Sequence, residues 1–143
     1  MKKIALNLTF LFVLCCAAFA LAGGVNLAAL KVEAMKAVPG SKSMGESGEE
    51  HAAFVGLQVG EMNYQFTLAP DVDPGIPDAQ KITYKGRTAY FFDPGMPGAG
   101  GLMILLGEDR SLTILCMSGF SSDKSIHLED MTTIADKMNL DIL

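Results

Sequence analysis

Two neighbouring segments alternate apolar and polar residues so regularly that they restrict this part of the chain to one local structure, a β-hairpin. Residues 61–68, EMNYQFTL, and residues 51–60, HAAFVGLQVG, place apolar side chains at alternate positions, as a strand with one buried face does. A two-residue turn at Gly60–Glu61 pairs the two strands so that apolar residues meet apolar ones. The predicted pairs are Val59 with Met62, Leu57 with Tyr64, Val55 with Phe66 and Gln58 with Asn63. A slip of one residue would turn every side chain to the other face, so the pattern predicts the register as well as the strands.

Two further hairpins follow along the chain. In residues 82–92, ITYKGRTAYFF, a turn at Gly86–Arg87 predicts that Tyr84 opposes Ala89 and Ile82 opposes Phe91. Residues 102–117, LMILLGEDRSLTILCM, predict two strands around a four-residue loop at 107–110, with Leu105 opposite Leu112 and Met103 opposite Ile114. These last two strands are apolar on both sides, so we expect them at the centre of the sheet.

A helix is predicted at each end of this strand-rich region. Residues 25–38 repeat apolar side chains at helical spacing and end at Pro39–Gly40. Residues 128–138 do the same, and Glu129 and Asp130 occupy the first turn, where the helix dipole favours negative charge. The predicted apolar positions are Leu27, Leu30, Ala34, Met35 and Val38 in the first helix, and Leu128, Met131, Ile134, Ala135 and Met138 in the second. We therefore predict an α+β domain: an antiparallel β-meander of about six strands in three hairpins, packed with an N-terminal and a C-terminal helix.

A family resemblance covers residues 82–138. The order GRTAYFF, LMILLG, LTILCMSG and LEDMTTIADKM resembles a domain of unknown function found in bacterial envelope proteins. The resemblance implies an envelope location and a β-meander closed by a C-terminal helix. It implies no catalytic residues.

The N-terminal segment has the features of a secretory signal peptide. Lys2 and Lys3 precede an apolar run, and Ala20-Leu21-Ala22 forms the small-x-small pattern read by signal peptidase. We predict cleavage after Ala22 and a bacterial protein that is periplasmic or secreted. Two alternatives remain open: the segment stays uncleaved as a membrane anchor, or Cys15 or Cys16 carries a lipid.

The remaining residues, 23–143, are enough for one domain with its own core. Two lysines leave with the signal segment, so nine basic residues face sixteen acidic ones, a net charge of −7. Such an acidic surface repels phosphate backbones, and we expect no nucleic-acid partner. Cys116 is the one cysteine left, which excludes an intramolecular disulfide. The Gly-, Ser- and charge-rich residues 39–51 predict a flexible linker after the first helix.

The glycine-rich stretch at 91–107, FFDPGMPGAGGLMILLG, is interpreted as a turn between strands. A phosphate-binding loop leads into a helix, whereas LMILLG reads as a strand, and Gly101–Leu102 stand where a Walker motif needs Lys and Ser or Thr. We expect the loops at 69–81 and 93–101 to be contact surfaces. Their candidate contact residues are Asp71, Asp73, Asp93 and Met96.

Catalytic and metal-binding patterns are weak in this sequence. Cys116 and His127 form the one candidate nucleophile pair, but Cys116 lies in an alternating strand, where a small buried hydrophobic role is favoured. The acidic stretch DVDPGIPD, residues 71–78, departs from a calcium loop after its first two aspartates. We expect no catalytic residue, metal site or cofactor, and we interpret Met62, Met103, Met117, Met131 and Met138 as core side chains.

These observations leave three hypotheses for function. The first is a non-enzymatic periplasmic binding or protein-interaction module that presents the two loops to an envelope protein partner. The second is a small carrier that holds a lipid or another apolar ligand between sheet and helix. The third, a Cys-His enzyme, has the least support in the sequence.

Overall fold

The computed structural model describes residues 26–119 and 124–143. The predicted signal peptide at 1–22, with Cys15 and Cys16, lies outside the described residues. Within the described ranges, none of the helices has the length and apolar character needed to cross a membrane.

The fold is one antiparallel sheet with helices on one of its faces, an α+β arrangement. The strands are β1 (Lys42–Gly48), β2 (Ala53–Val59), β3 (Met62–Ala69), β4 (Gln80–Tyr84), β5 (Arg87–Phe92), β6 (Ala99–Leu105) and β7 (Ser111–Met117). The helices are α2 (Leu27–Ala37), α3 (Leu128–Ala135) and the short 3-10 helix η1 (Leu140–Ile142). The sheet therefore has seven strands, and the prediction of about six was wrong by one strand.

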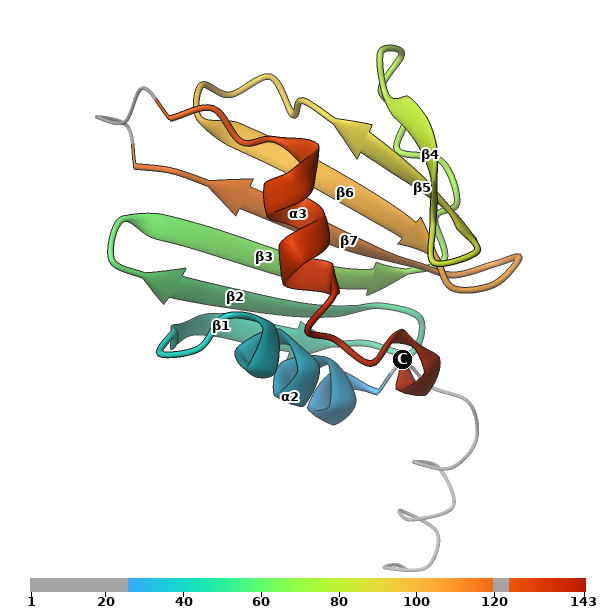
Figure 1. Cartoon of the computed structure of the whole chain (residues 1–143). Helices are drawn as coiled ribbons and strands as arrows, with labels where there is room; N and C mark the ends of the chain where they lie inside the picture. The colour runs from blue at the N-terminus through green and yellow to red at the C-terminus, as the bar shows by residue number, and fades with distance from the viewer. Residues whose placement is uncertain (1–25, 120–123) are drawn as a thin grey trace, which may run out of the picture.

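The strand order is β1-β2-β3-β7-β6-β5-β4. It consists of two meanders, β1 to β3 and β4 to β7, joined where β3 pairs with β7. The connection from β3 to β4 therefore carries the chain to the opposite edge of the sheet (Figure 1). A simple succession of three hairpins does not contain this crossing, so the predicted meander is correct within each half and incomplete as a description of the whole sheet.

The hairpin of β2 and β3 has the predicted register. Val59 pairs with Met62, Leu57 with Tyr64, Val55 with Phe66 and Gln58 with Asn63. Gly60 has φ +56° at the first turn position, a backbone conformation that glycine adopts without a steric penalty. The alternation and the turn residue are thus sufficient to place this hairpin.

The other two hairpins differ from the predictions in register. Between β4 and β5 the turn is Lys85–Gly86, with both residues at positive φ, and Tyr84 pairs with Arg87 while Ile82 pairs with Ala89. Between β6 and β7, Leu105 pairs with Ser111 and Ile104 with Leu112. The amide of Leu106 donates to the Arg110 carbonyl at 2.9 Å and closes a loop one residue longer than predicted. The predicted pairings Tyr84–Ala89, Ile82–Phe91, Leu105–Leu112 and Met103–Ile114 were therefore wrong.

Strand β1 occupies most of the predicted flexible linker at 39–51. All seven residues of β1 are exposed, and the strand pairs with β2 through a register shift between Ser43 and Gly45. An edge strand that buries no side chain has no alternating pattern, which explains why the sequence was misread there.

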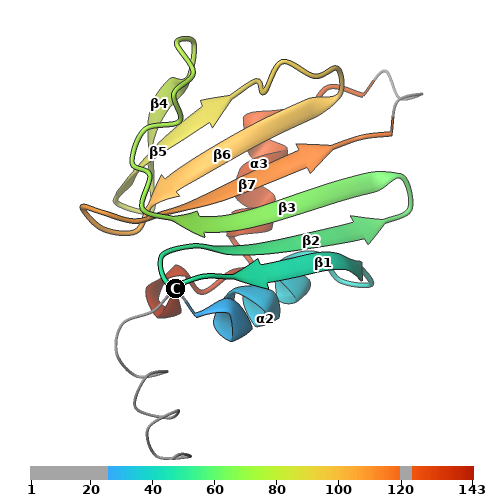
Figure 2. The same ribbon diagram turned by 180° about the vertical axis from the view of Figure 1, so that it is seen from behind.

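The core lies between the sheet and helices α2 and α3, which cover the same face of the sheet (Figures 1 and 2). Helix α2 contributes the buried residues Leu30, Ala34 and Ala37, and α3 contributes Met131 and Ala135. They pack on inward-facing strand residues, among them Val55, Leu57, Phe66, Leu102, Ile104, Leu112 and Ile114. Met35 is 42% exposed, so its predicted place on the buried stripe of α2 was wrong.

A buried carboxylate takes part in this packing. Glu33 of α2 is 3% exposed, and its Oε2 accepts from the Asn139 amide at 2.6 Å. Its Oε1 accepts from Lys36 Nζ at 2.9 Å. Burial raises the pKa of Glu33, but the hydrogen bonds from Asn139 and Lys36 outweigh it and hold the pKa below its ordinary value. Glu33 thereby joins α2 to the segment that follows α3.

Candidate binding surface

The face of the sheet opposite α2 and α3 carries no helix, as the view from behind shows (Figure 2). We call it the helix-free face. Its side chains alternate with the core residues along the strands other than β1, which is exposed throughout. Its larger members are Phe54, Tyr90, Phe92, Met103, Leu105, Leu115 and Met117. An apolar sheet face is normally covered by another layer of structure. The helix-free face is therefore a candidate binding surface.

On part of the helix-free face, aromatic side chains pack over glycines of the sheet. Phe92 pairs with Gly101 across β5 and β6, and its ring lies where a Cβ atom on Gly101 would stand. This close approach needs glycine at position 101 and explains why Phe92 is nearly buried on a face without a helix. Phe54 lies in a similar way beside Gly56, at ordinary contact distance. Phe92 therefore offers little of its surface to a partner.

The predicted contact loop at 93–101 connects β5 to β6, and its last three residues, 99–101, belong to strand β6. Asp93 Oδ1 accepts from the Gly95 amide at 2.8 Å, which forms a local turn. The Gly98 carbonyl accepts from both the amide and the hydroxyl of Ser118, at 2.8 Å and 3.0 Å. These bonds tie the loop to the end of β7. The loop leads into strand β6, as predicted for a turn, and leaves Met96 47% exposed at its tip.

An apolar cavity of about 350 Å³ opens beside this loop. Its lining residues are Asn63, Met96, Pro97, Ala99, Met117, Ser118 and Gly119. A second cavity of about 520 Å³ lies along the same loop and includes Phe92, Asp93 and Met96. Met96, Pro97 and Ala99 line both cavities, and Met96 presents an exposed thioether side chain to them. Met side chains adapt to varied partners because they are unbranched and polarizable.

The second predicted contact loop, 69–81, lies against the same face of the sheet at another place. A cavity of about 390 Å³ is lined by loop residues from Asp73 to Ala79 and by Tyr90 of β5. Asp73 Oδ1 accepts from the Gly75 amide at 2.7 Å, and Asp71 is exposed. Asp73 and Asp93 thus both begin loop turns next to β5, while the predicted contact residues Asp71, Asp73, Asp93 and Met96 do not gather into one cluster.

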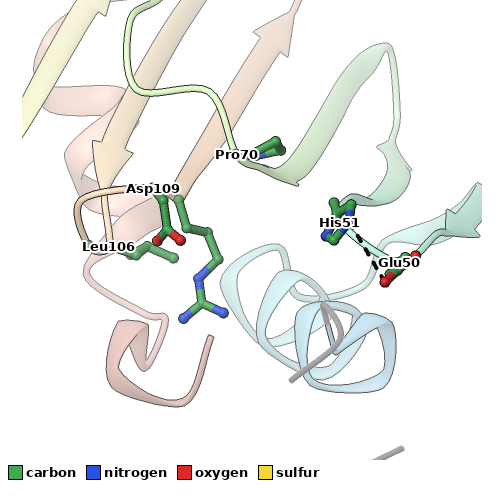
Figure 3. A pocket seen from close by; sticks show the side chains of 7 residues that line it. Glu50, His51, Pro70, Leu106 and Asp109 are labelled. Carbon is green, nitrogen blue, oxygen red and sulfur yellow. Dashed lines mark ion pairs between the residues drawn. The ribbon is translucent and has the colours of Figure 1, made fainter. Parts of the chain in front are cut away.

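A polar cavity of about 200 Å³ lies at the end of the sheet where three loops approach one another (Figure 3). Glu50 and His51 come from the β1–β2 loop, Pro70 follows β3, and Leu106 and Asp109 belong to the β6–β7 loop. His51 Nε2 lies 3.8 Å from Glu50 Oε1, and both side chains are more than three-quarters exposed. Such solvated groups recognise little by themselves, so the apolar cavity beside Met96 is the better candidate.

The candidate nucleophile pair is not arranged for chemistry. Cys116 is 2% exposed on the helix-covered face, where it pairs with Tyr64 of β3. Burial, helped by the charge of Asp130, raises the pKa of Cys116 to about 11, so the thiol is protonated at neutral pH. His127 precedes α3 and is exposed, and its backbone amide donates to Asp130 Oδ2 at 2.8 Å. The described residues contain no group of three or more His, Cys, Asp or Glu side chains suited to a metal ion.

Met117 and Asn63 line the apolar cavity beside Met96, and neither was predicted from the sequence as a contact residue. Met117 was interpreted as core, but it lies on the helix-free face, opposite in direction to its neighbour Cys116. The alternation of β7 contains this information once Cys116 is assigned to the core.

Comparison with family models, curated proteins and solved structures found no match to this chain.

Proposed function

We propose that the protein is a non-enzymatic binding module that docks a protein partner on the helix-free face beside Met96. The observation that carries the proposal is the apolar cavity of about 350 Å³ next to an exposed methionine, on a sheet face without a covering layer. Aromatic residues and methionine are enriched at protein interfaces. A partner that inserted an apolar side chain beside Met96 would bury this surface.

The layer between sheet and helices gives less support to the carrier hypothesis. Leu30, Leu112 and Met131 are fully buried there and fill the space with side chains, as close-packed cores do. A lipid chain in that layer would have to displace core residues. Mass spectrometry of the purified protein tests the carrier directly, since a stoichiometric co-purified lipid would favour it.

We place this binding activity in the bacterial envelope, after removal of residues 1–22. The signal-peptide pattern of the N-terminus and the resemblance of residues 82–138 to an envelope domain support this location. An enzyme is the least supported hypothesis, because its candidate thiol is buried and protonated.

Site-specific photo-crosslinking in the native host tests the proposed function. A photoreactive amino acid replaces Met96 in one variant and Met44 in another. Met44 is the matched control because it is 61% exposed on edge strand β1, away from the cavity. We expect a discrete crosslinked species from position 96 that position 44 does not give, and its loss when Met117→Gln is added. Equal crosslinking from both positions, or none from position 96, would refute the proposal.

A further inference from the structure

We infer that the centre of the helix-free face binds a neutral oligosaccharide, which lies across strands β2, β3 and β7. This inference goes beyond the proposed function, because it assigns a second ligand to the same face and does not depend on the protein partner. It rests on a group of side chains that the protein itself leaves without hydrogen bonds.

Strand pairing arranges the side chains at the centre of this face in three rows. Strands β2, β3 and β7 lie side by side there (Figure 2). Neighbouring strands are about 4.8 Å apart, and alternate residues of one strand about 6.8 Å apart, so the rows form one continuous surface, which we call the carboxamide patch. Its rows are Phe54–Thr67–Thr113, Gly56–Gln65–Leu115 and Gln58–Asn63–Met117.

The polar side chains of the carboxamide patch have no hydrogen-bond partner within the described protein. Gln58, Asn63 and Gln65 each carry two N–H donors and one carbonyl acceptor. These side chains and the hydroxyls of Thr67 and Thr113 are half-buried. None of them hydrogen-bonds to another residue of the described ranges. Polar groups removed from water ordinarily have such partners, so this set is available to a ligand rich in donors and acceptors.

The charge of the patch selects an uncharged ligand. Strands β2, β3, β6 and β7 contain no Asp, Glu, Lys, Arg or His, although 19% of the chain is charged. Charged residues border this region, among them Lys42 on β1, Lys81 on β4 and Glu61 in the β2–β3 turn. They differ in sign and lie outside the central strands. An ionic group bound over Gln65 would face no counter-charge there, whereas a neutral ligand loses nothing by this.

Apolar surface flanks the central carboxamide of Gln65. A Cβ atom added to Gly56 would lie 3.4 Å from Cζ of Phe54, so the Phe54 ring extends over Gly56, which pairs with Gln65. Leu115 lies on the other side of Gln65. A sugar ring combines apolar C–H faces with hydroxyls that both donate and accept, and apolar C–H groups pack well on an aromatic ring.

Other neutral ligands match the patch less well. A lipid chain would cover the carboxamides without supplying hydrogen bonds, which costs free energy. An extended peptide presents one N–H and one C=O per residue, whereas each sugar ring carries several hydroxyls. The density of unbonded donors and acceptors therefore favours the oligosaccharide.

Isothermal titration calorimetry of the mature protein with three uncharged tetrasaccharides tests the inference. The probes are cellotetraose, maltotetraose and tetra-N-acetylchitotetraose, which differ in linkage and substituents. We expect at least one to bind with a Kd of about 0.1 to 1 mM. That Kd should change less than about twofold between about 50 mM and about 500 mM salt, because no ion pair forms. Tetragalacturonate, an anionic tetrasaccharide, should bind at least about tenfold more weakly.

Gln65→Leu should weaken the binding about five- to tenfold, because leucine has a similar size but cannot hydrogen-bond. Gln80→Leu is the matched control: Gln80 is exposed on β4, at the edge of the sheet, and its replacement should leave the Kd unchanged. The salt and charge comparisons use the wild-type protein, so they test the inference even if Gln65→Leu is unstable.

Four results would overturn the inference. They are no binding of any of the three sugars at about 10 mM, tighter binding of tetragalacturonate, equal weakening by the two variants, and tighter binding of an uncharged serine-threonine peptide than of every sugar. Crosslinking from position 96 tests the protein partner separately, so each of the two proposals can fail alone.

Discussion

Replacing the buried carboxylate Glu33 with glutamine should destabilise the protein far more than an equivalent change on the surface. The carboxylate accepts from the Asn139 amide on Oε2 and from Lys36 on Oε1. Lys36 Nζ also lies 2.7 Å from Oε2, so the single acceptor oxygen of glutamine can stay with Asn139 at that position. In Glu33→Gln, the buried Asn139 amide therefore donates to a neutral acceptor in place of a charged one.

The magnitude follows from the difference between charge-assisted and neutral hydrogen bonds. That difference is about 1 to 2 kcal/mol in the free energy of unfolding for a buried acceptor. With a urea m-value of about 2 kcal/mol/M, the unfolding midpoint should fall by about 0.5 to 1 M. The Lys36 ammonium is half exposed, so its ion pair adds little to the loss.

The pH dependence provides an independent readout of the same interaction. Because the pKa of Glu33 is lower in the folded protein than its ordinary value of 4.5, the unfolded chain takes up the proton first as pH falls. The stability that Glu33 contributes is therefore fully present above about pH 4.5 and is lost as pH falls through the folded pKa. The stability gap between wild type and Glu33→Gln should accordingly narrow in acid.

Glu46→Gln is the matched control for this measurement. Glu46 of β1 pairs at 2.7 Å with Lys31 of α2, the helix that also carries Glu33. Both side chains of this pair are about 40% exposed. Its replacement should cost less than about 0.5 kcal/mol. The reasoning is wrong if urea unfolding shows equal losses for the two variants, or if the gap between wild type and Glu33→Gln stays constant in acid.

Three further predictions concern the thiol, the helix-free face and the N-terminus. Cys116, with its pKa raised to about 11 by burial, should resist iodoacetamide at neutral pH until urea unfolds the protein, and rapid native labelling would contradict its burial. Gly101→Ala should cost about 1 to 3 kcal/mol in urea unfolding because the new methyl overlaps the Phe92 ring. Gly107→Ala, which meets no atom closer than 4.0 Å, should be nearly neutral, so similar losses would argue against the ring contact. Intact mass of the protein from its native host should show Gly23 as the first residue, whereas a retained Met1 would rule out cleavage.

The hairpin of β2 and β3 could be predicted from the sequence because two independent signals agree there. Alternation places Val55 and Phe66 on one face, and Gly60 supplies the positive φ of the turn. Between β4 and β5 the second signal misleads, since Lys85 also adopts φ +47°. A sequence reading reserves that conformation for glycine, and the predicted turn therefore began one residue late.

Strands β6 and β7 lack the pattern that would determine their register. Leu102 and Met103 are both buried although they point to opposite faces of the sheet, and the same holds for Ser111 and Leu112. When both sides of a strand are apolar, shifting the β6–β7 register by one residue still pairs apolar residues with apolar ones. The alternation of the sequence then does not distinguish the two registers. The placement of β7 beside β3 depends on contacts between distant segments, which no local pattern encodes.

The candidate surface was predicted in part. Met96 stood out as an apolar residue between prolines in a glycine-rich loop, and it lines two cavities. Met117 and Asn63 complete the surface through the pairing of β3 with β7, which only the three-dimensional arrangement reveals. Glu33 is a similar case, because its partner Asn139 lies 106 residues further along the chain.

Methyl NMR of the methionine side chains tests the central claim, that a partner docks beside Met96, most directly. The methionines report on separate regions: Met96 and Met117 line the cavity, Met35 and Met44 are exposed on α2 and β1, and Met131 is buried. Addition of the protein identified by crosslinking from position 96 should shift the methyl resonances of Met96 and Met117 and leave those of Met35, Met44 and Met131 in place. Shifts at Met35 and Met44 with Met96 and Met117 unchanged would contradict the claim and move the binding surface to the α2–β1 edge.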